Sequence, residues 1–89
     1  MPKFVVVHPV GKEMTLEGVT PIGKAVKAGS TPDAYWLGSR YLREEGKAYC
    51  DWDAKDANSI RKVLAKAVPE LPTEGIYKVE FEVQGEDYR

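Results

Sequence analysis

GKAYCDWDAKDANSI, residues 46 to 60, joins a strand pattern directly to a helix pattern. Small and aromatic residues alternate in its first half, as in a strand with one buried side: Ala48, Cys50 and Trp52. The second half offers Asp53 or Asp56 as the N-cap of a helix. Apolar residues then recur at helical spacing until Pro69 ends the pattern: Ala57, Ile60, Val63, Leu64 and Ala67. This stretch predicts a strand over Lys47 to Asp53 and an amphipathic helix after it.

The N-terminal third of the chain repeats this order. Residues Lys3 to Pro9 are short, β-branched and apolar, which is typical of a buried central strand. Thr20 is a typical N-cap residue, and Pro21 after it suits the first position of a helix. They predict a first helix that ends at Gly29. A helix that starts earlier, at Thr15, is the alternative, although Pro21 would weaken its interior.

The remaining segments read as strands. Ala34 to Leu42 has the aromatic content of a strand, and the turn residues 43–46 connect it as a hairpin to the strand that begins at Lys47. Ile76 to Val83 alternates as the last strand, and residues 84–89 are expected to form a frayed tail. The order strand-helix-strand-strand-helix-strand predicts a single α+β domain over residues 1–89, a ferredoxin-like βαββαβ sandwich. Its four-stranded antiparallel sheet has the order 4-1-3-2, with both helices on one face.

Composition restricts the function. Lys and Arg (13) nearly balance Asp and Glu (14), so the net charge of -1 provides no field that would attract nucleic acid or anionic membrane. The only cysteine, Cys50, cannot form an internal disulfide. The apolar run at the N-terminus is too short for a signal peptide or a membrane span. We expect a cytoplasmic protein.

The period of each strand predicts which side chains face the helices and which face outward. We expect the helices to be packed against alternate residues of the first, third and last strands: Val5, Val7, Ala48, Cys50, Trp52, Tyr77, Val79, Phe81 and Val83. The opposite parity assigns a mixed, partly apolar set to the outer face: Phe4, Val6, His8, Lys47, Tyr49, Asp51, Asp53, Ile76, Lys78, Glu80 and Glu82. This parity also predicts that His8 lies near Lys47, Tyr49 and Lys78. An apolar patch of this kind needs a cover, so we expect a ligand or a second copy of the chain on Phe4, Val6, Lys47, Tyr49, Asp51 and Lys78.

The segment 45–52 lies where an RNA-recognition motif carries its RNP1 octapeptide, and it matches that pattern only in part. Glu45 replaces the basic first residue, and Lys47 replaces a stacking aromatic. Asp51 and Asp53 place negative charge where phosphates would lie. We therefore expect no nucleic-acid partner.

A second similarity extends over nearly the whole chain. It rests on five short motifs in a fixed order: Val7-His8, Gly18-Val19-Thr20-Pro21, Tyr49-Cys50, Ala54 before an acidic residue, and Leu71-Pro72 followed by Ile76 and Val79. In these the chain resembles a family of small bacterial proteins of unknown function that includes nickel-binding members. The resemblance implies a ferredoxin-like homodimer whose two sheets pack face to face. It also implies that the protein binds a nickel ion. Relatives that bind nickel are implied to be richer in histidine than this chain.

His8 is the only histidine, so it is the one candidate metal ligand of that type. A dimer could supply a second His8, or carboxylates could complete the shell. Cys50 points inward by parity and is expected to be a buried small hydrophobe. The sequence leaves open whether any divalent metal, such as nickel, is bound.

An enzyme is the alternative to a binding protein. Dimeric ferredoxin-like barrels resemble cofactorless monooxygenases and isomerases that act on small apolar molecules. His8 as general base and Tyr49 as hydrogen-bond donor would be the minimal catalytic pair. No nucleophile triad, phosphate loop or paired carboxylates indicate a particular reaction. The sequence favours a homodimeric binding protein for a small molecule or a metal.

Overall fold

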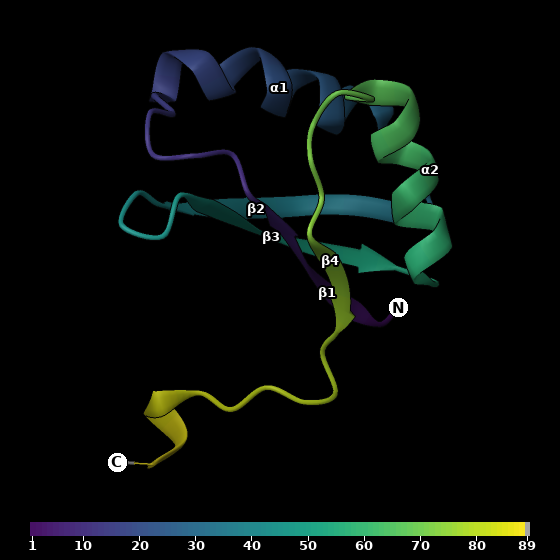
Figure 1. The fold of residues 1–89 in the computed structure, drawn as a ribbon. Coiled ribbons are helices and arrows are strands. Elements are labelled where there is room, and N and C mark those ends of the chain that lie inside the picture. Colours follow the sequence, from purple (N-terminus) through teal and green to yellow (C-terminus); the bar gives the residue numbers. More distant parts are fainter. Residues whose placement is uncertain (89) are drawn as a thin grey trace.

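The computed structural model describes residues 1–88, and its elements follow the predicted order (Figure 1). The strands are β1 (Lys3–His8), β2 (Ala34–Leu42), β3 (Lys47–Ala54) and β4 (Gly75–Lys78). The helices are α1 (Leu16–Gly29) and α2 (Ala57–Ala67), and a 3-10 turn, η1 (Gly85–Tyr88), follows β4. The predicted frayed tail is described as far as Tyr88, and position 89 lies outside the described residues.

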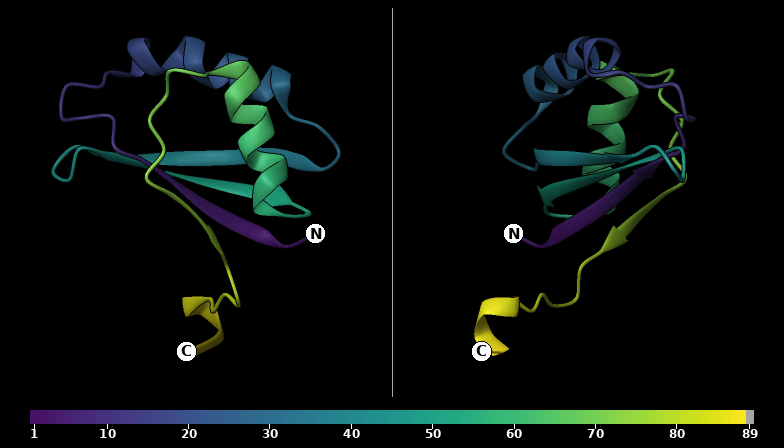
Figure 2. Two further views of the ribbon diagram at one scale, coloured as in Figure 1. Left: turned by 45° about the vertical axis from the view of Figure 1, so that its right-hand side comes forward. Right: turned by 90° about the vertical axis from the view of Figure 1, so that its left-hand side faces the viewer.

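The sheet has the order β2-β3-β1-β4, and every neighbouring pair is antiparallel. This is the predicted order 4-1-3-2 read from the other edge. Both helices cover the same face of the sheet (Figure 2). We call this face the helix side and the other the open side. The predicted ferredoxin-like α+β fold is confirmed.

Two side-chain caps fix where the helices begin. The Thr15 hydroxyl accepts a hydrogen bond from the Gly18 amide at 3.0 Å, so α1 begins at Leu16 and the predicted start at Thr20 is wrong. Pro21 is tolerated inside α1, where it removes one backbone donor from an exposed turn. Asp56 caps α2 by accepting from the Ser59 amide at 2.8 Å. In α1, the hydrogen bond at the Thr15 cap therefore outweighs the free-energy cost of Pro21 inside the helix.

The predicted side assignment is correct for β3 and wrong for β1. Directly opposite residues of antiparallel strands project to the same side, and Val6 pairs with Cys50 while His8 pairs with Ala48. The first strand therefore turns three residues toward the helices that were expected on the outer face: Phe4, Val6 and His8. Val5, opposite Asp51, and Val7, opposite Tyr49, lie on the open side instead. Three consecutive valines carry no period, so only the cross-strand register could decide this.

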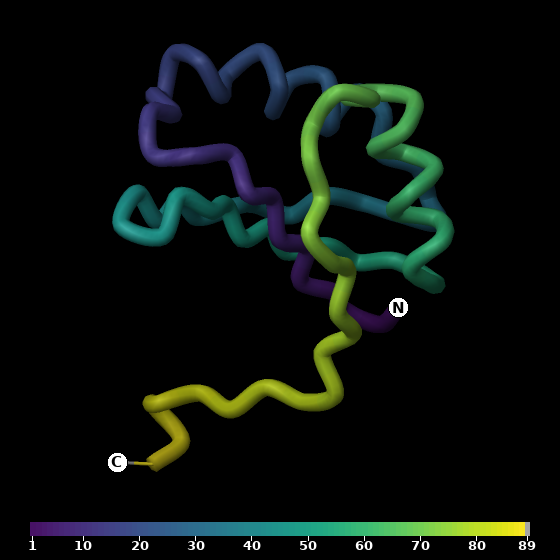
Figure 3. The backbone as a smooth tube through the Cα atoms, viewed as in Figure 1, coloured from purple at the N-terminus to yellow at the C-terminus, as the bar shows by residue number. Residues whose placement is uncertain are grey.

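The last strand is shorter than predicted and also has the opposite parity. Ile76 pairs with Val6 on the helix side, and Tyr77 pairs with Val5 on the open side. β4 pairs only with β1, and its ladder ends near Lys3, the first residue of β1, whose carbonyl accepts from the Val79 amide at 2.9 Å. Beyond this point residues 79–88 leave the body of the molecule as an arm (Figure 3). The alternation of this segment is real, but it has no neighbouring strand to pair with.

The core fills the space between the helix side and both helices. It contains residues from three strands and the two helices: Phe4, Val6, Val26, Ala34, Cys50, Trp52, Ala54, Ile60, Val63 and Leu64. Trp52, Ile60 and Val6 are the largest side chains that are fully buried. Among the described residues, no helix is long and apolar enough to cross a membrane.

Candidate functional site

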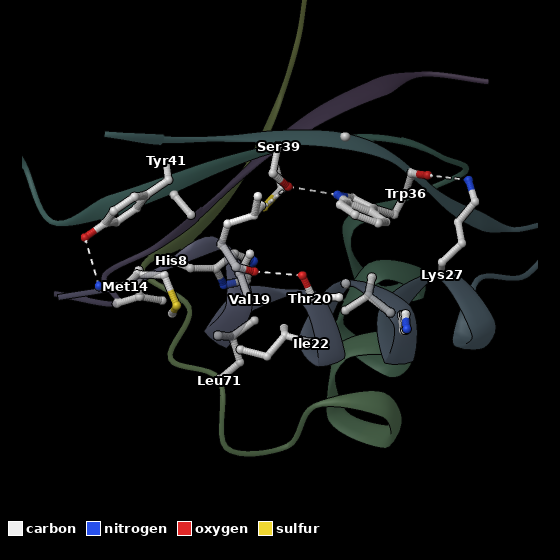
Figure 4. Close-up of a pocket in the computed structure, with 18 of the residues that line it drawn as sticks. His8, Met14, Val19, Thr20, Ile22, Lys27, Trp36, Ser39, Tyr41 and Leu71 are labelled. Atoms are coloured by element: carbon white, nitrogen blue, oxygen red, sulfur yellow. Dashed lines mark hydrogen bonds between the residues drawn. The ribbon is translucent and has the colours of Figure 1, made fainter. Parts of the chain in front are cut away.

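A cavity of about 710 Å³ lies between α1 and the helix side of the sheet (Figure 4). This is within the usual range for a small-molecule site, roughly 300 to 1,000 Å³. Most of its wall is apolar, with residues from β2, β3, both helices and two loops: Val10, Val19, Ile22, Val26, Trp36, Ala48, Trp52, Leu64 and Leu71. A few polar side chains interrupt this wall: His8, Thr20, Ser39, Tyr41 and Cys50. Such a space suits a largely apolar molecule.

His8 ends β1 at the wall of this cavity and is 2% exposed. Its Nδ1 lies 2.9 Å from the Pro72 carbonyl and 3.2 Å from the Thr73 hydroxyl. A carbonyl can only accept, so Nδ1 carries the proton and Nε2 keeps a lone pair. Burial lowers the pKa of His8, although the hydrogen bond to Pro72 partly opposes this. At neutral pH the imidazole is therefore uncharged.

A bulge in β2 brings a chain of polar groups to the cavity wall. The pairing with β3 shifts register between Trp36 and Gly38, so Ser39 and Trp36 both project to the helix side. The Trp36 indole donates to the Ser39 hydroxyl at 2.9 Å, and that hydroxyl contacts the Cys50 sulfur at 2.8 Å. Burial raises the pKa of the Cys50 thiol, so the sulfur stays protonated at neutral pH. The predicted inward position of Cys50 is confirmed.

Among the described residues, Trp52 supplies the one buried side-chain nitrogen or oxygen that has no hydrogen-bond partner. Its side chain lines the cavity and is 1% exposed. Within residues 1–88 its indole Nε1 has no hydrogen-bond partner. Leaving a buried donor unsatisfied costs about 1–3 kcal/mol, and native proteins rarely do so without a bound water, ion or ligand.

One end of the cavity is closed by the loop that precedes α1. Tyr41 donates to the Gly11 carbonyl at 2.6 Å and accepts from the Met14 amide at 3.4 Å. The Arg43 guanidinium donates to the carbonyls of Lys12 at 2.8 Å and Met14 at 2.9 Å. These bonds fix the loop against β2.

Three of the other predicted site residues, Lys47, Tyr49 and Asp51, lie on the open side, and each pairs with a neighbour. The Tyr49 hydroxyl donates to the Glu45 carboxylate, which raises the pKa of Tyr49. Lys47 forms an ion pair with Glu74 at 2.9 Å, and the same carboxylate raises the pKa of Lys47. Asp51 lies 3.8 Å from Arg40. All three carry exposed surface, and each already has a partner.

The structure separates residues that the sequence was expected to bring together. His8 and Tyr49 project to opposite sides of the sheet, because β1 and β3 pair His8 with Ala48. Lys78 lies opposite Phe4, at the other end of β1 from His8. The expected cluster of His8 with Lys47, Tyr49 and Lys78 is therefore wrong. Phe4 and Val6 also leave the expected ligand or dimer face, since both are buried under the helices.

Sequence reasoning missed the contribution of β2 to the cavity. Trp36, Ser39 and Tyr41 do not alternate evenly, and the bulge at Leu37 is what unites them. Gly38, next to the bulge, was the only available signal, because glycine inside a strand often marks one.

The protein-family comparison matches residues 4–79 to the family described as "Nickel responsive protein SCO4226-like". The chain belongs to this family. The resemblance expected from its motifs is thus confirmed. A solved structure titled "Crystal structure analysis of SCO4226 from Streptomyces coelicolor A3(2)" is similar to this SCO4226-like chain with a TM-score of 0.79. The similarity covers 91% of this chain and 99% of that one at 17% identity, and it shows the fold. Comparison with curated proteins found no match.

The side chains of this SCO4226-like chain do not fit a nickel ion. Within residues 1–88, no three His, Cys, Asp or Glu side chains gather as ligands would. His8 offers a single nitrogen in an apolar wall, and the nearby Cys50 thiol is protonated at neutral pH. Nickel sites in proteins need several converging nitrogen, oxygen or thiolate ligands. Because His8 faces the helix side, a dimer formed through the open sides would not bring two copies of it together.

Proposed function

We propose that this chain is a non-catalytic binding protein that holds one small, mostly apolar molecule in the cavity under α1. The observation that carries the proposal is a cavity of about 710 Å³ whose wall is mostly apolar and includes Trp36 and Trp52. An apolar molecule would fill this space. The neutral Nε2 of His8 gives one acceptor for a hydroxyl group.

Binding is favoured over catalysis because the expected catalytic pair is divided. Tyr49 is hydrogen-bonded to Glu45 on the open side, so it cannot assist a base that lines the cavity. The groups that hydrogen-bond to the His8 ring are the Pro72 carbonyl and the Thr73 hydroxyl, which orient it, and burial leaves the ring uncharged.

The chain provides its own reporter for this binding. Both of its tryptophans, Trp36 and Trp52, line the cavity, so ligand entry should change intrinsic fluorescence. We expect titration with decan-1-ol to give a saturable fluorescence change with one molecule per chain. Absence of any saturable change would contradict the proposal.

A variant that fills the cavity makes the test specific. A Cβ at Gly23 would lie 3.5 Å from the Trp36 ring, which is ordinary contact, so Gly23→Leu should extend into the free space without a clash. We expect this variant to fold and to lose most of its affinity for decan-1-ol. The matched control is Ala28→Leu, an exposed position of the same helix away from the cavity. Equal affinity of both variants would place the ligand elsewhere.

We further propose that the protein is a homodimer formed through the open side and the C-terminal arm. Several large apolar side chains are exposed there: Leu42 (45%), Tyr77 (53%), Phe81 (81%) and Val83 (63%). Exposed apolar groups that lie together usually mark an interface. A second copy is the simplest cover, because the arm leaves the body as an extended segment.

Light scattering over a wide concentration range tests the dimer. We expect twice the mass of one chain, and we expect Phe81→Asp to shift the equilibrium toward the monomer. Leu16→Asp is the matched control, since Leu16 is equally exposed, at 82%, but lies on α1. A monomer at every concentration would refute this arrangement.

A further inference from the structure

The charged residues around the cavity are all cations. Three of its lining side chains carry charge, Lys24, Lys27 and Arg43, and no Asp or Glu is among them. The chain as a whole has slightly more acids than bases, 14 against 13. The positive character of the cavity is therefore local and does not follow from the composition.

These cations differ from four others in the part of the chain that the structure describes, Lys3, Arg40, Lys47 and Lys55, each of which forms an ion pair with a carboxylate. On the open side, Arg40 and Lys47 each face a carboxylate. Around the cavity no cation forms an ion pair with a residue of the range 1–88. The Arg43 guanidinium already donates hydrogen bonds to two backbone carbonyls.

Lys24 and Lys27 are one turn apart, so their side chains emerge from the same side of α1. The Lys27 ammonium donates to the Trp36 carbonyl at 3.2 Å and lies 3.8 Å from the centre of the Tyr35 ring. Lys24 has no hydrogen-bond or ionic partner among residues 1–88. A negative group bound here would meet two ammonium groups and no competing carboxylate.

We propose that the ligand of the cavity is an apolar monocarboxylate, with its hydrocarbon part among the core side chains and its carboxylate at Lys24 and Lys27. This inference rests on the binding function proposed above. Exposed ammonium groups alone bind a carboxylate weakly, but an adjoining apolar space adds the burial of the hydrocarbon. The arrangement selects against apolar cations, because nothing negative lines the cavity.

The test compares three probes with the same hydrocarbon tail: decanoate, decan-1-ol and decyltrimethylammonium. Intrinsic fluorescence at pH 8 and low salt gives each affinity. We expect decanoate to bind about fivefold to tenfold more tightly than decan-1-ol, as two exposed ion pairs would give, and the quaternary amine to bind most weakly. Added salt should reduce the decanoate advantage.

Variants separate this inference from the proposed function. The double substitution Lys24→Gln and Lys27→Gln should remove the advantage of decanoate, so that the variant binds decanoate no more tightly than it binds decan-1-ol. Lys62→Gln with Lys66→Gln, two exposed positions on α2, is the matched control. Equal binding of decanoate and decan-1-ol, or tighter binding of the amine, would contradict the proposal that the ligand is a carboxylate. The proposed binding function would remain. Failure of all three probes to bind would refute the binding function itself.

Discussion

The two sides of the sheet are built from adjacent residues of the same strands, yet they have different environments. On the helix side Val6 is fully buried and packs in the core with Cys50 and Trp52. On the open side its neighbour Val5 is only half buried, opposite Asp51 and Tyr77. The polar groups differ in the same way. On the open side Lys47 and Asp51 each have an ionic partner, whereas the Trp52 indole on the helix side has no partner among residues 1–88.

This difference teaches that burial in the thin core of a small domain is decided by what covers a strand. On the open side Lys47 and Asp51 have ionic partners, and a hollow of about 470 Å³ between Val5, Arg40 and Tyr49 is smaller than the cavity of about 710 Å³ on the helix side. The helix side keeps an apolar cavity beneath α1, because Gly23 and the small residues Ala48 and Ser39 leave room that the larger side chains do not fill. A ligand site is therefore expected on the side that most resembles a core.

The largest expected effect on stability comes from valine-to-alanine substitutions, one on each side of the sheet. Val6→Ala deletes two fully buried methyl groups and should lower the free energy of unfolding by about 2 kcal/mol. Val5→Ala at the half-buried position should lower it by roughly 0.5–1 kcal/mol. Urea denaturation of both variants at low protein concentration measures the contrast.

Repeating this measurement at high protein concentration sharpens the comparison. If two copies pair through the open side, the cost of Val5→Ala should grow with concentration while that of Val6→Ala stays the same. Equal costs for the two variants at low concentration would mean that the sides are not distinguished by burial.

A smaller effect is expected from pH, through His8 on the helix side. Burial lowers the pKa of His8 in the folded protein, so the unfolded chain binds the proton first as the pH falls. The free energy of unfolding should therefore be highest above the ordinary histidine pKa of about 6.5 and should decrease as the pH falls below it. Denaturation between pH 8 and pH 5 measures this slope.

His8→Gln is the control, because glutamine can donate to the Pro72 carbonyl but does not titrate. Its slope over the same pH range should be flatter than that of the natural protein. Asp56, whose pKa is lowered by its cap hydrogen bonds to Ser59, affects stability only at more acidic pH. A slope unchanged by His8→Gln would show that another group is responsible.

The fold was largely predictable, because its signals are local. The alternation of Ala48, Cys50 and Trp52 placed β3 correctly, and the helical spacing from Ala57 to Ala67 placed α2. The start of α1 was mispredicted because two threonine caps compete there, and Thr15 makes the bond. β4 ends beside the first residues of its only partner, β1. The alternating pattern of residues 79–83 contains no information about the length of that partner.

Much less of the candidate site could be predicted. His8 was identified as a functional candidate, but its neighbours Pro72 and Thr73 are far away in the sequence. The wall made by Trp36, Ser39 and Tyr41 depends on one bulged residue, Leu37. A shift of one residue changes the side of every later side chain in a strand.

By itself, the sequence determined the order of the elements, the order of the strands and the membership of a small family, and it limited the cap of α2 to Asp53 or Asp56. These follow from hydrogen bonding and periodicity within short segments, and from motifs in a fixed order. Only the tertiary structure decided which side of the sheet each residue of β1 and β4 faces, and hence that His8 joins the cavity while Tyr49 does not. The physical reason is that a run of valines has no period of its own, so its orientation is set by the strand it pairs with and by the helices that cover it.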